Sequence, residues 1–184
     1  MPTILNILAC LLLLPSLAQG DSIRLQADAV QVEDGDTLLV KLDGEMQRLQ
    51  LTGIDAPEDS ENPKLKVDLE RTQLDRDTLL SLGMMATNHL RDLIAAANRL
   101  NLIYLPDDRD RYGRLQGDVR DGLGNNSLAR TMVADGFAVV TLDEADSQRS
   151  DWLESQKQAY DQKLGLWGLL RKPAVLWAGK YLNP

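Results

Sequence analysis

The chain is poor in the residues that build covalent or thiolate centres. Among 184 residues there are one cysteine, one histidine and one phenylalanine. The cysteine, Cys10, falls within the first 20 residues, so the remainder can form neither a disulfide nor a thiolate metal site. The scarcity of histidine and cysteine also disfavours zinc and copper. The hydrophobic core must therefore stabilise the fold unaided.

Residues 1–20 lack charged side chains altogether. Their apolar centre runs for about ten residues, which is too short to cross a bilayer and is typical of a secretory signal peptide. The small residues Ser16 and Ala18 predict cleavage after Ala18, with Gly20 as the second choice. We therefore expect a secreted or periplasmic protein with a signal peptide at 1–18. Because no Lys or Arg precedes the apolar run, an uncleaved membrane anchor stays open, as does lipidation at Cys10.

Basic residues are in the minority, and the net charge of the chain is −8 at pH 7. Such a charge repels a polyanion, so a nucleic-acid site would have to be a local basic patch helped by a cation. The length is sufficient for one domain with a proper core.

The first half of the chain begins with β-rich runs. Residues 23–32, 37–42 and 46–52 predict an antiparallel meander, with Asp43 and Gly44 in the tight turn between the last two strands.

A polar stretch at residues 56–77 predicts a long surface loop, which is either a mobile lid or, as we favour, a tolerated insertion. Leucines and alanines at helical spacing then predict a helix over residues 78–98 with Asp77 as its cap.

The second half alternates short strands and helices. We expect strands at 101–105, 115–119 and 137–142, a short helix between Asn126 and Gly136, and a third helix that ends at Gly165. The pattern predicts an α+β domain over residues 23–170, a five-stranded Greek-key β-barrel of the OB type with about three packed helices. Residues 171–184 form a C-terminal extension to which the sequence assigns no role.

Acidic residues recur near the expected ends of two strands, in Asp-Gly-Asp-Thr at 34–37 and Gly-Ile-Asp-Ala-Pro-Glu at 53–58. Carboxylates that meet there would suit a hard cation such as Ca²⁺ or Mg²⁺. Each motif by itself also reads as an ordinary turn or loop. Likewise Arg48 alone would be a solvent-facing strand residue, and Arg-Tyr-Gly-Arg at 111–114 a charged hairpin.

The joint order of these motifs resembles the staphylococcal nuclease (thermonuclease) family. That family combines Asp-Gly-Asp-Thr, an arginine, Asp-x-Pro-Glu and Asp-x-Tyr-Gly-Arg, and every piece is present between Asp34 and Arg114. Weaker matches extend the resemblance over roughly residues 25–168. The chain departs from the family at 138–144, where tyrosines that often stack on a base are missing, so affinity and base preference are open.

The resemblance implies a Ca²⁺-dependent nuclease that acts on DNA and/or RNA. One Ca²⁺ would be bound by Asp36, Asp55 and the carbonyl of Ala56. Asp34 and Thr37 would orient these ligands without binding the ion themselves. The partner would be the nucleic-acid substrate; no stable protein partner is inferred, and a membrane is involved only if the N-terminal segment is uncleaved.

The resemblance also assigns roles in the reaction. Arg48 and Arg114 would hold the phosphate, and Glu58 would act through water as a general base or as an orienter of that water. Arg111 and Tyr112 would flank the nucleotide. The chemistry agrees, because two guanidinium groups and a divalent cation offset the charge that develops on a phosphodiester under attack. The alternative is a non-catalytic OB-type module that binds nucleic acid or protein.

Overall fold

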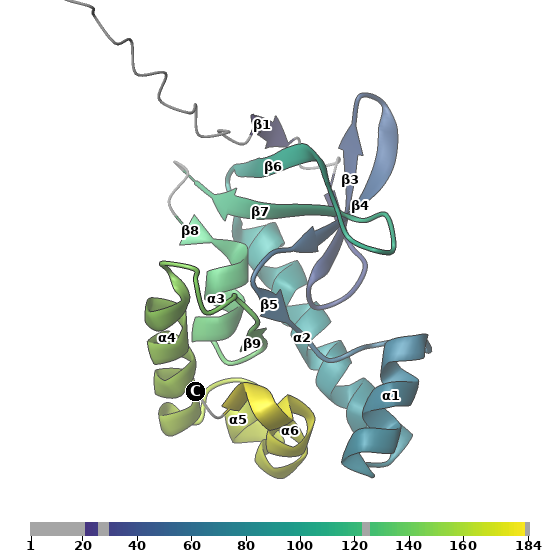
Figure 1. The fold of residues 1–184 in the computed structure, drawn as a ribbon, viewed down its shortest axis with the longest axis vertical. Helices are drawn as coiled ribbons and strands as arrows, with labels where there is room; N and C mark the ends of the chain where they lie inside the picture. The colour runs from purple at the N-terminus through teal and green to yellow at the C-terminus, as the bar shows by residue number, and fades with distance from the viewer. Residues whose placement is uncertain (1–20, 26–29, 123–125, 183–184) are drawn as a thin grey trace, which may run out of the picture.

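The computed structural model describes residues 21–25, 30–122 and 126–182 (Figure 1). The expected signal peptide at 1–18 and both expected cleavage points lie outside the described residues. Within these three ranges, no helix is both long enough and apolar enough to cross a bilayer.

The main sheet is a curved, mixed sheet of seven strands. Its order is β1-β6-β7-β4-β3-β2. In addition, β8 pairs with the C-terminal end of β7, beyond the residues that pair with β4. All pairs are antiparallel except β4 with β7, which run parallel and bring the two halves of the sheet together. The strands of this sheet are β1 (Asp21–Leu25), β2 (Val30–Val32), β3 (Thr37–Leu42), β4 (Glu45–Leu51), β6 (Leu100–Arg109), β7 (Leu115–Asp121) and β8 (Asn126–Ser127).

The α+β class is confirmed, but the strand count is wrong. The described residues form nine strands in two sheets. The expected strand at 23–32 is two strands with different partners, and two short strands, β5 (Ile54–Asp55) and β8, were not predicted. β1 pairs with β6, while β2 joins the predicted meander with β3 and β4.

The expected strand at 137–142 is reduced to two residues. β9 (Val139–Val140) pairs with β5 (Ile54–Asp55) in a small second sheet. Within β9, the N–H of Val140 donates to the side-chain oxygen Oε1 of Gln156 at 2.7 Å, and not to a neighbouring strand. A side chain from α4 thus satisfies one backbone donor of β9, while the N–H of Thr141 still donates to the carbonyl of Gly53 at 2.9 Å.

The predicted loop at 56–77 contains a helix, α1 (Pro63–Thr72). Asn62 caps it, since its side chain accepts a hydrogen bond from the N–H of Leu65, and Pro63 follows at the first helical position. Leu65 is buried against the rest of the protein. The segment is thus ordered and packed, and its helix corrects the predicted loop.

The expected helix at 78–98 is confirmed as α2 (Arg76–Ala96), although its cap is Asp75 and not Asp77. The short helix near 128 is α3 (Leu128–Ala134), capped by Ser127 and not Asn126. In both cases a neighbouring residue could also have served as the cap. The remaining helices are α4 (Arg149–Gln162), α5 (Leu166–Leu169), α6 (Arg171–Ala178) and a 3-10 helix (Gly179–Leu182).

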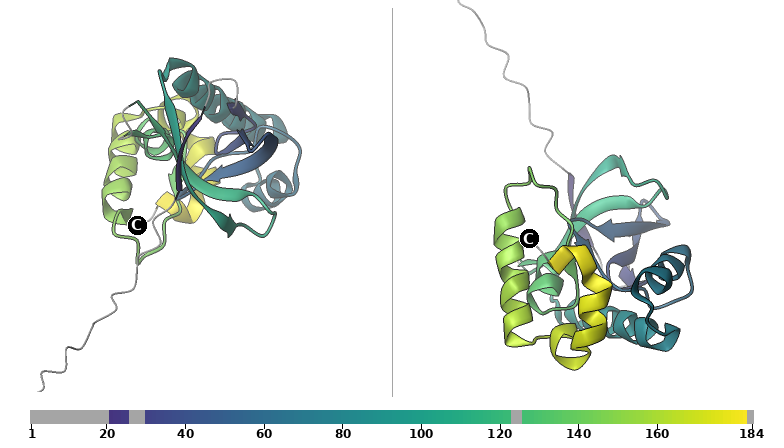
Figure 2. Two further views of the ribbon diagram at one scale, coloured as in Figure 1. Left: turned by 90° about the horizontal axis from the view of Figure 1, so that it is seen from above. Right: turned by 60° about the horizontal axis from the view of Figure 1, so that its bottom comes forward.

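Two hydrophobic clusters hold the molecule together. The first fills the curved main sheet and reaches α2 and α3. The second lies below it, where α6 contacts α1 and α2 (Figures 1 and 2). Trp167 and Trp177 are buried in the second cluster. The C-terminal extension thus closes the core that also anchors α1.

We expect Trp177→Ala to lower the free energy of unfolding by about 3–5 kcal/mol, since a fully packed indole leaves a large cavity. The matched control is Leu176→Ala, because Leu176 is 50% exposed and its loss should cost no more than about 0.5 kcal/mol. Urea unfolding of both variants measures the difference. Equal stability of the two variants would show that α6 is dispensable for the core.

Candidate active site

The turn between β2 and β3 presents the first acidic pair. Backbone hydrogen bonds from Glu33 and Asp34 to the carbonyl of Thr37 close the turn. Asp34 Oδ1 accepts from the N–H of Asp36 at 3.0 Å, and Asp36 Oδ2 accepts from the N–H of Ala56 at 2.8 Å. Asp36 therefore ties this turn to the segment that follows β5.

Two glycines allow the acidic segments to approach α2. A side-chain carbon on Gly35 would lie 2.8 Å from the Cβ of Ala56 and 2.9 Å from the Cβ of Ala86. A side-chain carbon on Gly83 would overlap the carbonyl group of Glu58. Gly83 is thus a positioning residue that the sequence did not single out, because a lone glycine in a helix carries no specific signal.

The segment after β5 carries the second set of oxygens. Asp55 lies at the end of β5, and the Ala56 carbonyl and the Glu58 carboxylate follow. The ammonium of Lys64 in α1 contacts all three, at 2.9 Å from Asp55 Oδ1, 2.8 Å from Ala56 O and 2.7 Å from Glu58 Oε1. Asn62 donates to the other carboxylate oxygen of Glu58.

The parallel pairing of β4 with β7 aligns the two arginines. Leu49 pairs with Leu115, so Arg48 and Arg114 each lie one residue before the first pair of the parallel ladder. The mean strand separation of about 4.8 Å then places the two arginines side by side. Sequence reasoning could not supply this register.

Arg114 is held in place by Asp110. Arg114 Nε donates to Asp110 Oδ2 at 2.7 Å, and the backbone N–H groups of Tyr112 and Arg114 donate to Asp110 Oδ1. Burial alone raises the pKa of Asp110, but these hydrogen bonds outweigh it and lower the pKa. Arg114 Nη1 also donates to Thr37 Oγ1 at 3.2 Å, which connects the arginine to the turn that carries Asp36.

Arg48 is paired with Glu33 through two hydrogen bonds of 2.7 and 2.6 Å. The Arg48 side chain is 49% exposed, compared with 21% for Arg114. Glu33 was not predicted as a site residue, and only its place beside Asp34 in the sequence hinted at it. Because the Arg48 pair is exposed to solvent, an anion can compete with Glu33 for the guanidinium at modest cost.

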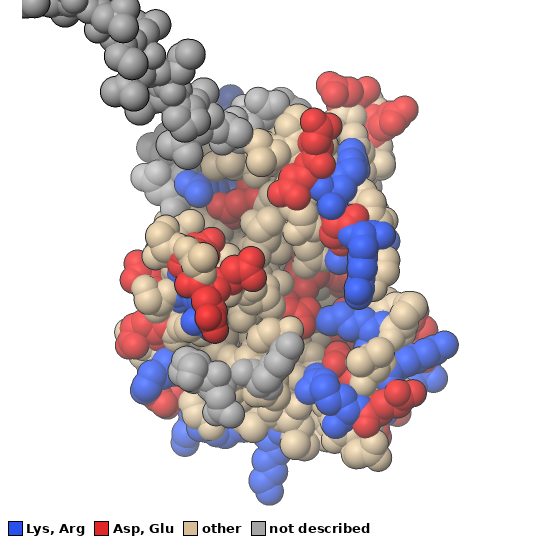
Figure 3. Space-filling model, viewed as in Figure 1, with Lys and Arg blue, Asp and Glu red and all other residues tan. Residues whose placement is uncertain are grey.

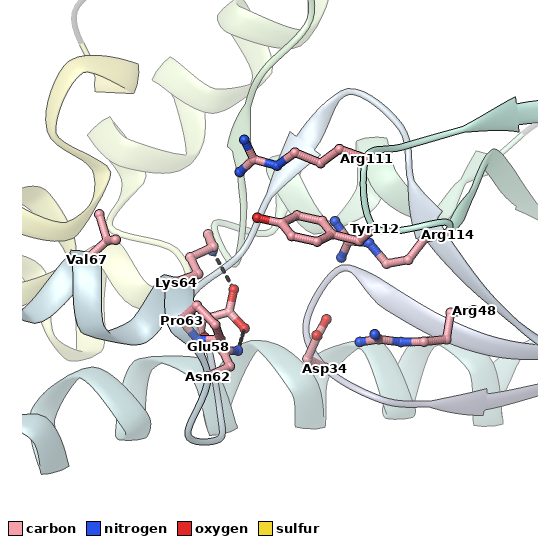
Figure 4. Close-up of a pocket in the computed structure, with 10 residues that line it drawn as sticks. All are labelled: Asp34, Arg48, Glu58, Asn62, Pro63, Lys64, Val67, Arg111, Tyr112 and Arg114. Carbon is pink, nitrogen blue, oxygen red and sulfur yellow. Dashed lines mark hydrogen bonds and ion pairs between the residues drawn. The ribbon is translucent and has the colours of Figure 1, made fainter.

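These groups face one open pocket of about 500 Å³ (Figure 4). Figure 4 shows Arg48 directed toward Asp34, and Tyr112 and Arg111 extending over the pocket from the β6–β7 hairpin. Tyr112 is 65% exposed, with its ring near the guanidinium groups of Arg111 and Arg114. The lining residues are Asp34, Arg48, Glu58, Asn62, Pro63, Lys64, Val67, Arg111, Tyr112 and Arg114.

Of the ten residues predicted for the site, the pocket wall contains Asp34, Arg48, Glu58, Arg111, Tyr112 and Arg114. The other four, Asp36, Thr37, Asp55 and Ala56, are not among the lining residues but are joined to the wall by hydrogen bonds and ion pairs. Residues distant in sequence therefore meet in one region.

Burial and mutual repulsion perturb the acids. Burial, together with the charge of Asp36, raises the pKa of Asp34 to about 8. Burial also raises the pKa of Asp55 to about 6, although Lys64 opposes that rise. For Lys64 itself, burial lowers the pKa, but the carboxylates of Asp55 and Glu58 outweigh burial and raise it. Lys64 is consequently a permanent cation at neutral pH.

The donor chemistry fits a hard cation, because the set consists of carboxylate and carbonyl oxygens. In the described part of the chain, however, no three His, Cys, Asp or Glu side chains are arranged as a formed metal site. The oxygens of Asp55, Ala56 and Glu58 converge on the Lys64 ammonium instead. A metal at these oxygens therefore requires Lys64 to move.

The surface charge is unevenly distributed on the face drawn in Figure 3. Lys and Arg side chains gather at the right, where the β6–β7 hairpin faces α1, with acidic side chains among them and above them, and a further acidic group lies toward the left (Figure 3). A local basic region therefore exists despite the net charge of −8. This is the arrangement that an acidic protein needs in order to approach a polyanion.

Comparison with known proteins gives consistent matches. The family model described as "Staphylococcal nuclease homologue" matches residues 48–168. The chain is similar to the thermonuclease of Staphylococcus hyicus, with 27% identity over 139 residues, 75% of this chain and 73% of the relative. The thermonuclease of Staphylococcus intermedius is 26% identical over 138 residues, 74% of this chain and 73% of the relative.

An uncharacterized protein of Methanocaldococcus jannaschii is 26% identical over 146 residues, which cover 75% of this chain and 69% of the relative. The segment matched by the family model contains Arg48, Glu58 and Arg114, and it begins after the turn that carries Asp36.

Proposed function

The chain belongs to the staphylococcal nuclease family, and from this premise we propose that it is a Ca²⁺-dependent nuclease that hydrolyses phosphodiester bonds of DNA and/or RNA outside the cytoplasm. Two of the relatives reported above are thermonucleases, which supports phosphodiester cleavage as the reaction.

One observation carries the proposal. Arg48 and Arg114 lie side by side, each one residue before the start of the parallel β4–β7 ladder, and both line the pocket that also contains the Glu58 carboxylate. A module that only binds a polyanion gains nothing from a carboxylate beside its phosphate contacts, since the carboxylate repels the ligand. The combination of two planar donors and one acid is what phosphodiester hydrolysis requires.

Each side chain has a defined task in this proposal. Arg48 and Arg114 bind the non-bridging oxygens of the scissile phosphate and stabilise the charge that grows on them during attack. Glu58 accepts a proton from the attacking water or fixes the direction of that water. Tyr112 and Arg111 contact the adjoining nucleotide through the exposed ring and the guanidinium above it.

A Ca²⁺ ion would be held by Asp36, Asp55 and the Ala56 carbonyl, with Asp34 and Thr37 supporting Asp36. When bound, it supplies positive charge to the phosphate and to the attacking water. Asp36 is well placed to serve as a ligand, because Ala56 N and Thr37 Oγ1 each bond to a different one of its carboxylate oxygens and fix its orientation.

Metal dependence tests the proposal. Purified protein should cleave plasmid and single-stranded DNA in Ca²⁺, and excess chelator should reduce cleavage to background, because two arginines alone do not activate water. Gel electrophoresis over a Ca²⁺ and Mg²⁺ series measures this. Cleavage that persists at full rate in chelator would contradict the metal requirement, and a gel shift without cleavage would contradict the enzyme assignment.

A non-catalytic OB-type binding module is the second candidate, and the contact of Lys64 with the acidic oxygens favours it, because that contact neutralises the site without a metal. Export rests on the sequence of residues 1–20 alone. N-terminal sequencing of the protein recovered from the medium, the periplasm and the membrane fraction tests export and cleavage after Ala18.

A further inference from the structure

Lys64 occupies an unusual position for a lysine at a helix N-terminus. It is the second residue of α1, and its side chain turns back from the helix toward the segment that follows β5 (Figure 4). An ammonium group has three N–H donors. The three oxygens within 2.9 Å of Nζ, on Asp55, Ala56 and Glu58, match that number.

The backbone that carries Lys64 is firmly anchored. Leu65 is buried in the second hydrophobic cluster, and Asn62 both caps α1 and donates to Glu58. At the other end of α1, Arg71 donates to the carbonyls of Leu176 and Trp177 in α6. The C-terminal extension therefore holds the helix that delivers Lys64 to the acidic oxygens.

The Lys64 side chain is nevertheless free to move into solvent. It is 39% exposed and lines the open pocket, so it can rotate away from the oxygens without any movement of α1. Its neighbour Lys66 lies exposed on the same helix and makes none of these contacts with the acidic oxygens. Lys66 thus provides an internal reference for Lys64.

We propose that Lys64 is a tethered cation that competes with Ca²⁺ for the oxygens of Asp55 and Ala56, while it also holds Glu58, and thereby sets the metal affinity of the site. The inference rests on the proposed function, since it takes these oxygens as the metal-binding region. An ammonium and a divalent cation on the same oxygens would lie within a few ångströms of each other and repel strongly. Metal binding therefore requires the Lys64 side chain to leave.

The same exchange affects Glu58. While Lys64 and Asn62 each bond to one oxygen of its carboxylate, Glu58 is poorly available to a water molecule. Departure of Lys64 frees Oε1, the oxygen that it contacts at 2.7 Å. Lys64 is accordingly a positioning residue that couples metal binding to the availability of Glu58, rather than a catalytic residue.

Chemical labelling of the unmodified protein tests the exchange. Acylation of lysines with acetic anhydride, followed by peptide mass spectrometry, should show Lys64 slow relative to Lys66 in chelator. Saturating Ca²⁺ should raise the Lys64-to-Lys66 ratio by roughly tenfold, because an ammonium with three charged or carbonyl acceptors is protected and a solvent-facing amine is not. An unchanged ratio in Ca²⁺ would overturn the proposal.

Calorimetry provides an independent readout that does not depend on activity. Lys64→Met keeps the apolar stem but removes the charge, and it should tighten Ca²⁺ binding by roughly tenfold. The matched control Lys66→Met should leave the affinity unchanged, and Asp55→Asn should abolish binding. If Lys64→Met does not fold, as judged by circular dichroism, the labelling of the unmodified protein decides.

The failures are distinguishable. Equal Ca²⁺ affinity of Lys64→Met and the unmodified protein would overturn the competition and leave the proposed metal-dependent nuclease intact. No Ca²⁺ binding to either protein would overturn the metal site of the proposed function and the competition with it.

Discussion

Arg114→Ala and Arg48→Ala are each expected to lower kcat/KM for DNA cleavage by at least about a hundredfold, because removal of one preorganised donor to the transition state costs on the order of 3 kcal/mol. Arg114 should be the more sensitive position. Asp110 and Thr37 fix its guanidinium, so little freedom remains to be lost when it binds phosphate. Arg48 must first leave Glu33.

Steady-state cleavage of a defined oligonucleotide measures the effect, and the control is Arg120→Ala. Arg120 lies on β7, the strand that follows Arg114. It pairs with Asp118 and does not line the pocket. Arg114→Lys adds a test of geometry, since an ammonium keeps the charge but loses the planar pair of donors. Full activity in Arg114→Ala, with an unchanged unfolding midpoint, would remove this arginine from the reaction.

The motifs were readable from the sequence because each combines a residue type with a local turn. Asp34 and Asp36 frame a glycine, and Asp55 and Glu58 frame a proline. Such segments specify their own backbone path, so the resemblance could locate them by their residue types and their order along the chain. The helix α2 was predictable from another local signal, the helical spacing of its apolar residues.

The α1 helix was missed because its burial depends on distant partners. Its sequence is mostly polar, and Leu65 becomes buried only when α2 and α6 cover it. The Asn62 and Pro63 pair was a usable local signal, since a capping side chain followed by proline is typical of a helix start. The signal was overlooked because the many charged residues of this segment led to the prediction of a loop.

The contacts of Lys64 and Glu33 could not be predicted for a different reason. Each is one of several charged residues in a mixed segment, and only the folded backbone selects which of them reaches the site. Lys64 and Lys66 are both lysines of α1, yet one contacts Asp55 and the other is exposed. A helix places residues two positions apart on different faces, which separates their roles.

Glu58→Gln should lower the rate of cleavage by between about a hundred- and ten-thousandfold, the usual contribution of a general base, while Ca²⁺ binding persists. Glutamine preserves the shape, and its one amide oxygen can still accept from either Asn62 or Lys64, so the fold should hold. Loss of the charge also weakens the hold on Lys64, which should leave Ca²⁺ affinity equal or tighter. Calorimetry and cleavage assays on one preparation separate the two effects.

The control for Glu58→Gln is Asp55→Asn. Asp55 is the proposed ligand, so its variant should lose Ca²⁺ binding and cleavage together, whereas Glu58→Gln should lose cleavage alone. The two carboxylates contact the same ammonium at 2.9 and 2.7 Å, so their removal perturbs Lys64 in similar ways. A Glu58→Gln variant that loses Ca²⁺ binding as completely as Asp55→Asn would make Glu58 a metal ligand and leave the proton of the attacking water without its proposed acceptor.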